Sequence, residues 1–178
     1  RKDGSWRYSD KPTDKTVDNI HTAQVLEGLA TTEPGPETRC AAAVKTGAEY
    51  LWAAFYDSDG YARENRCTPL RPLWPVRAFM HRVHIYLFPP ETRISGYGIA
   101  VKAFTATSQL GAGAEPNPNF YRARTVGHRL LKMQLSDGAM PWTTTDQSRY
   151  IRGQGHVFEG LTFLLAAEKA RERTRGEG

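Results

Sequence analysis

Two stretches of the sequence, DGSW at Asp3–Trp6 and DGAMPW at Asp137–Trp142, begin with the same Asp-Gly pair and reach a tryptophan within a few residues. Each leads over a similar span to the tripeptide Glu-Gly-Leu, at residues 27–29 and 159–161. A third Asp-Gly pair lies at Asp59-Gly60, 56 residues after the first pair and 78 before the last, so one unit carries an insertion of about 22 residues. The chain therefore contains an internal repeat, and we interpret the other segments by their position within it.

Three segments of this repeat are predicted to be inner helices. Residues 16–31, 97–110 and 152–170 are apolar on nearly every side when they are placed on a helix. A helix with this composition is buried all round, so we expect these three in the interior of the protein.

Two further segments are predicted to be outer helices. Residues 118–135 carry apolar side chains on one face and Arg or Lys on the opposite face, and residues 37–56 are their counterpart in the preceding repeat. Such a helix faces solvent on one side. Asn117 before Pro118 is typical of a capping residue followed by the first helical position. Because glycine accepts the positive φ that ends a helix, each Asp-Gly pair is expected to close an outer helix.

The order of inner helix, outer helix and Asp-Gly turn predicts one all-α domain over residues 1–178, built from helical hairpins. The insertion is expected before the middle inner helix. No helix precedes Asp3-Gly4 in this sequence, so we expect the chain to be the C-terminal portion of a longer array. A missing N-terminal half or another protein chain would then complete the structure.

The composition argues against several classes of protein. The formal charge is +5, but the basic residues are scattered among carboxylates, whereas nucleic-acid binders cluster them on one face. No apolar run approaches the roughly 18 residues that a membrane span requires, so no membrane partner is expected. Two cysteines, Cys40 and Cys67, are too few for a disulfide scaffold, which favours a cytoplasmic protein. No cofactor is predicted.

Several blocks resemble a mostly uncharacterised bacterial family of α/α-toroid proteins, often encoded among polysaccharide genes. These blocks are Asp3–Tyr8, Val17–Thr22 and Val25–Leu29. The ending Arg149–His156 is similar to the last inner helix of that family and, more distantly, to that of unsaturated glucuronyl hydrolases. The resemblance implies an (α/α) toroid of up to twelve helices, of which this chain supplies roughly the last five.

The sequence also departs from that family. The segment Ile94–Ala100 lacks the Asp and the His that the family carries in its middle repeat, and His156 stands where the relatives usually have Trp. The resemblance therefore supports the fold better than it supports any one reaction.

Asp18 and His21 are candidate catalytic residues. They lie three residues apart near the start of an inner helix and so share one face. A carboxylate beside an imidazole orients the ring and raises its basicity, as general acid/base catalysis requires. The alternative is that Asp18 caps the helix and His21 is a buried polar group whose hydrogen bonds are satisfied.

Arg152, His156 and Glu159 occupy the matching place in the last inner helix. His156 and Glu159 are candidate catalytic residues. Arg152 is a candidate substrate-binding residue, because Arg binds a carboxylate or phosphate through two parallel hydrogen bonds. The alternative is that Arg152 and Glu159 form structural ion pairs between neighbouring hairpins.

Trp6, Tyr8 and Trp142 lie in the irregular segments just before inner helices. Flat aromatic faces pack against the apolar faces of sugar rings, so all three are candidate substrate-binding residues. They could equally close the mouth of the toroid as core residues.

The insertion, residues 65–92, precedes an inner helix and is therefore expected to lie over or beside the face that carries the candidate site. There it would act as a lid or a binding loop, or form a subunit contact. It contains His81 and His84, which with Cys67 could be imagined as metal ligands. This spacing alone is too weak to predict a metal site, and none is predicted.

These observations favour a carbohydrate-active enzyme, a hydrolase, lyase or epimerase, that acts by general acid/base chemistry in a central toroid cavity. Its expected partner is a small sugar or oligosaccharide, including sugars that carry a carboxylate. One alternative is a non-catalytic helical-repeat module that binds a partner on its concave face. Another is an isoprenoid cyclase-like toroid, although the sequence has no Asp-rich run.

Overall fold

The computed structural model describes residues 1–7, 17–32, 39–62, 66–67, 92–110 and 117–176. These residues are mostly helical, which confirms the all-α prediction. The five helices are α1 (Asn19–Thr32), α2 (Arg39–Phe55), α4 (Ile94–Gln109), α5 (Pro118–Leu131) and α6 (Ile151–Gly176). Each corresponds to one of the five predicted segments. Most of the insertion at 65–92 lies outside the described residues.

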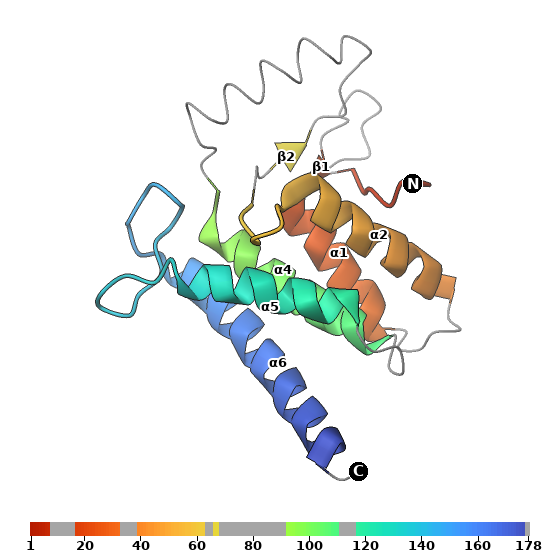
Figure 1. Ribbon diagram of the computed structural model, residues 1–178. Coiled ribbons are helices and arrows are strands. Elements are labelled where there is room, and N and C mark those ends of the chain that lie inside the picture. Colours follow the sequence, from red (N-terminus) through yellow and green to blue (C-terminus); the bar gives the residue numbers. More distant parts are fainter. Residues whose placement is uncertain (8–16, 33–38, 63–65, 68–91, 111–116, 177–178) are drawn as a thin grey trace.

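The helices form two layers (Figure 1). In one layer α4 lies between α1 and α6 and packs against both. In the other, α2 packs on α1 and α5 packs on α4. A short antiparallel pairing of β1 (Val17–Asp18) with β2 (Arg66–Cys67) fixes the backbone just before α1, with Asp18 opposite Arg66. The layer of α1, α4 and α6 corresponds to the predicted inner helices, and α2 and α5 to the outer ones.

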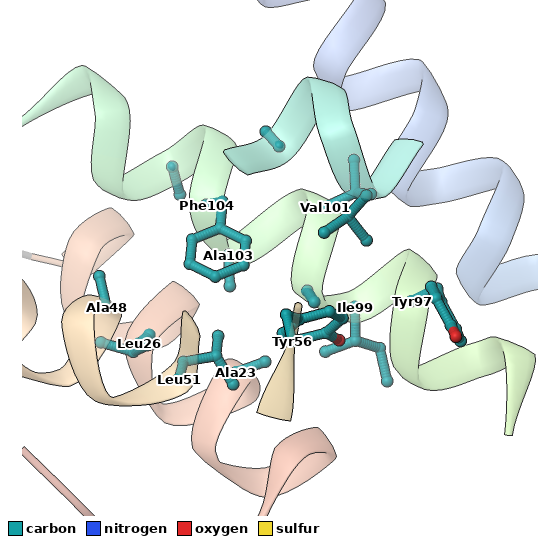
Figure 2. Packing of buried hydrophobic residues seen from close by; sticks show 14 of the residues in the cluster. Ala23, Leu26, Ala48, Leu51, Tyr56, Tyr97, Ile99, Val101, Ala103 and Phe104 are labelled. Atoms are coloured by element: carbon teal, nitrogen blue, oxygen red, sulfur yellow. The ribbon is translucent and has the colours of Figure 1, made fainter. Parts of the chain in front are cut away.

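The core is centred on α4. All of its 16 residues except Lys102 and Gln109 are buried, as predicted for a helix that is apolar all round. Figure 2 shows how its rings and aliphatic side chains meet those of α1 and α2. Phe104 and Tyr97 both lie edge-on to Tyr56, which follows α2, with ring centroids about 6.1 Å apart. Such edge-to-face pairs contribute beyond the area that they bury.

The expectation of all-round burial is wrong for α1 and for α6. Only five of the 14 residues of α1 are buried, as many as in the outer helix α5. The face of α6 toward α4 is buried, but Ile151, Phe158 and Leu165 are exposed to 91%, 73% and 50%. The reason is positional, because α6 stands at the end of its layer and extends past the other helices (Figure 1). No described element packs on its outer face. The amphipathic prediction for α5 is confirmed, with Asn117 as its N-cap and Pro118 at its first position.

The Asp-Gly turns have the predicted positive φ, but they do not themselves end the outer helices, since α2 ends at Phe55 and α5 at Leu131. Gly4, Gly60 and Gly138 have φ of 81°, 74° and 87°, and they are the described residues with positive φ. In the first and last turns the aspartate accepts the same hydrogen bond, from Ser5 N to Asp3 Oδ1 and from Ala139 N to Asp137 Oδ1, each 3.1 Å long. The turn is therefore a true structural repeat.

Two of the three turns also pack on an outer helix in the same manner. A Cβ on Gly4 would overlap the carbonyl of Thr46 in α2, and one on Gly60 would lie 2.9 Å from the carbonyl of Thr125 in α5. Both positions need glycine, because their φ is positive and their space is closed. At Gly138 a Cβ would meet only the end of the Gln134 side chain, at 3.8 Å. The first turn thus packs on α2 and the second on α5, in each case the next outer helix along the chain. No described outer helix follows the third turn.

Candidate functional site

The N-terminal ends of α1, α4 and α6 surround a cavity of about 200 Å³. Four residues proposed from the sequence line it: His21 on α1, Trp142 in the loop before α6, and Arg152 and His156 on α6. The repeat explains this meeting, because equivalent ends of neighbouring inner helices lie side by side. The other described lining residues are Ile20, Gln24, Arg93, Ser95, Ile99 and Gly153.

Asp18 and His21 form a close pair at the cavity wall. The Asp18 carboxylate is only 7% exposed, while the His21 ring is 54% exposed. His21 Nδ1 lies 2.8 Å from Asp18 Oδ2 and 2.9 Å from Oδ1, and because a carboxylate only accepts, Nδ1 is the protonated nitrogen. Asp18 Oδ1 also accepts the backbone N–H of His21 at 2.8 Å. Asp18 therefore caps α1 and orients the imidazole at the same time.

The backbone of α6 at His156 is held against α4 by a glycine. A Cβ on Gly98 would overlap the carbonyl of His156, so only glycine permits this approach. Gly153, one residue after Arg152, has more room, since a Cβ there would make only an ordinary contact with the Trp142 ring at 3.7 Å. The close packing at Gly98 therefore fixes where the backbone of His156 lies beside α4.

Trp142 sits in a loop that is tied to the start of α4. The backbone N–H of Ile94 donates to the Trp142 carbonyl at 3.1 Å, and that of Thr144 donates to the Thr92 carbonyl at 3.0 Å. The Trp142 ring is covered in part by protein groups, with the Arg93 guanidinium 5.3 Å from its centroid and the Tyr150 ring at 4.5 Å. Trp142 lines the cavity, but part of its ring already packs against its neighbours.

Arg93 is a cavity residue that the sequence analysis did not identify. An arginine before an apolar helix gives no local signal of function. The repeat could have revealed it, because Arg93 directly precedes α4 just as Asp18 directly precedes the helical residues of α1. Arg93 itself lines the cavity, whereas Asp18 lies behind the lining residue His21.

Glu159 is not among the described residues that line the cavity. Its carboxylate binds the ammonium group of Lys102 on α4, which also binds Glu27 Oε1 of α1 at 2.8 Å. Burial alone lowers the pKa of Lys102, but the hydrogen bonds to Glu159 and Glu27 outweigh it and raise the pKa above its ordinary value. Glu27 and Glu159 are equivalent residues of the first and last repeats, so this contact matches the structural ion pair considered for Glu159.

Trp6 lies away from the cavity. A Cβ on Gly47 of α2 would overlap the Trp6 ring, which shows how closely the ring packs on that helix. It is partly buried against the main core, in agreement with the core alternative. Tyr8 and both histidines of the insertion, His81 and His84, lie outside the described residues.

The described residues contain neither a cluster of metal ligands nor a helix that could span a membrane. Within the part of the chain that the structure describes, no three His, Cys, Asp or Glu side chains gather as metal ligands would. No helix in the described ranges combines the length and apolar composition needed to cross a membrane.

Comparisons with protein-family models, with curated proteins and with solved structures find no match.

Proposed function

We propose that this protein is a carbohydrate-active enzyme that uses general acid/base chemistry in the cavity at the starts of α1, α4 and α6. One observation carries the proposal: an oriented imidazole, a second imidazole and a guanidinium from two separate inner helices line one 200 Å³ space. A concave pocket on which a few polar groups converge is the default basis for an active-site or binding-site hypothesis.

The chemistry follows from the positions of these groups. Asp18 holds Nδ1 of His21, so proton exchange with a ligand falls to Nε2. His156 approaches the cavity from α6 and supplies a second group able to donate or accept a proton. Hydrolysis, β-elimination and epimerisation of a sugar all need such a pair. Arg152 is placed to bind a carboxylate of the substrate.

The architecture we propose is an incomplete (α/α) toroid. Its support is the alternation of inner and outer helices and the two turns that dock on the next outer helix. The exposed apolar face of α6 and the open turn at Gly138 support completion by further helical hairpins. A longer form of the chain or another chain would supply them.

The chemistry of the cavity argues against the isoprenoid cyclase alternative. Such an enzyme encloses an apolar chain in an aromatic-lined space, whereas two arginines and two histidines line this cavity. Burying an apolar substrate against them would remove charged groups from water without compensation.

The test compares three variants on a panel of oligosaccharides, with and without uronic acids. His21→Ala and Arg152→Ala are expected to abolish turnover while the melting temperature stays within a few degrees. His128→Ala is the matched control, because His128 is exposed on α5 and does not line the cavity. Reducing-end assays, absorbance of unsaturated products and NMR of the sugar distinguish hydrolysis, elimination and epimerisation.

Two outcomes would contradict the enzyme proposal. If His21→Ala and Arg152→Ala react like the parent, or if both unfold, these residues are structural. If the parent binds a sugar but no product forms in any of the three assays, the chain is the non-catalytic binding module instead.

A further inference from the structure

The cavity at the starts of the inner helices carries an unbalanced charge. Two guanidinium groups, Arg93 and Arg152, line it together with His21 and His156, while no aspartate or glutamate is among its described lining residues. The carboxylate of Asp18 is buried and engaged by the His21 ring. Low-dielectric walls lined by one sign of charge concentrate ligands of the opposite sign.

Neither arginine of the cavity has its charge neutralised within the described structure. Arg122, Arg124 and Arg149 each contact a carboxylate, from Glu49, Glu168 and Asp137 respectively. No such ion pair occurs for Arg93 or Arg152 among the described residues. These three arginines are therefore paired with carboxylates, whereas the two at the cavity are not, and their charges remain available to a ligand.

Arg93 is held in place by its surroundings. Its backbone forms an antiparallel bridge with Thr143, and its guanidinium lies over the Trp142 ring, 5.3 Å from the centroid. A cation over the face of Trp is attracted by the ring and loses rotamer freedom before any ligand arrives. Trp142 thus orients Arg93 toward the cavity that both residues line.

We infer that Arg93 and Arg152 form an anion clamp that makes the cavity selective for acidic sugars over neutral ones, and that Trp142 is the positioning residue for Arg93. The sugar part of this inference rests on the proposed function. The anion part rests only on Arg93 and Arg152, the two arginines that line the cavity without a carboxylate partner among the described residues. A carboxylate held between two guanidinium groups would place the sugar ring against His21 and His156.

The test measures binding of glucuronate, glucose and inorganic sulfate to the full chain by titration calorimetry or ligand-observed NMR. We expect the parent to bind glucuronate at least about tenfold more tightly than glucose, and to bind sulfate at low salt. Arg93→Gln and Arg152→Gln should each weaken glucuronate and sulfate binding about tenfold and leave glucose unchanged. Arg149→Gln is the control, since its partner Asp137 lies outside the cavity.

The three probes separate the two proposals. If glucose binds as tightly as glucuronate, the anion clamp is overturned and the sugar site survives. If sulfate binds in an Arg93-dependent way and neither sugar binds, the clamp stands and the sugar function falls. If none of the three binds, or if Arg149→Gln has the same effect as Arg93→Gln, the clamp is wrong.

A double-variant experiment tests the role of Trp142. Trp142→Leu should weaken sulfate binding in the parent background, but have no further effect once Arg93 is replaced by Gln. Equal effects in both backgrounds would show that Trp142 does not act through Arg93.

Discussion

Gly160 of α6 packs directly on Gly98 of α4, so closely that a Cβ on Gly160 would overlap the Gly98 carbonyl oxygen. This contact brings the last inner helix against the middle one and carries His156 and Arg152 to the cavity. The equivalent residue of the first repeat is Gly28 in α1, where a Cβ would meet nothing within 4 Å. The same sequence position therefore makes a close helix crossing in one repeat and faces open space in the other.

The first prediction uses this difference. Gly160→Ala should force α4 and α6 apart and destabilise the fold by about 1 to 3 kcal/mol, the usual cost of overpacking. Gly28→Ala should stabilise α1 by up to about 1 kcal/mol, because alanine is the better helix former. Urea denaturation of both variants checks this. Equal changes in the two variants would contradict the close packing at Gly160.

The helices themselves were predictable because their signals are local. Apolar spacing and the Asp-Gly pairs located all five, and Asn117 with Pro118 marked the start of α5 correctly. The burial of α6 was not predictable in the same way. Its sequence is apolar on several sides, but whether Phe158 is covered depends on which neighbour is present.

The candidate site was predictable only where the repeat placed residues at equivalent helix starts. His21 and His156 were found in this way and do line one cavity. Arg93 was missed, because no property of the residue itself sets it apart from other arginines. Trp6 and Glu159 were proposed from type and position, and the structure shows them packed on α2 and bound to Lys102 instead.

The second prediction concerns Lys102, whose side chain is only 19% exposed between Glu27 and Glu159. Lys102→Met should destabilise the protein by about 1 to 3 kcal/mol, because Glu27, 23% exposed, would be left as a mostly buried charge without a partner. Adding Glu27→Gln to Lys102→Met should recover part of this loss. Free energies from urea unfolding measure both. A double variant no more stable than the single one would argue against the pairing.

The third prediction concerns acid stability. The hydrogen bond from Arg122 holds the pKa of Glu49 below its ordinary value, against the opposing effect of burial. A carboxyl whose pKa is lower in the folded state stabilises the protein above its unfolded pKa, and this contribution disappears as the pH falls through the folded pKa. The parent should therefore be more stable than Glu49→Gln at pH 6, and the two should converge as the pH falls below about 4. Melting temperatures across this range test it. A constant difference would show that Glu49 does not act through its charge.

The fourth prediction concerns the outer face of α6, where Ile151, Phe158 and Leu165 recur every seven residues and are all at least half exposed. Apolar side chains at this spacing form one stripe along a helix, and a stripe without a partner favours association in water. The parent chain alone should therefore self-associate at tens of micromolar in light scattering. Phe158→Lys and Leu165→Lys should reduce that association without lowering the melting temperature, since neither side chain packs in the core. Thr31→Lys, at an exposed residue of α1, is the control for added charge away from this face. A monodisperse parent monomer of about 20 kDa would show that this face needs no partner, and it would remove the main support for a toroid completed by further hairpins.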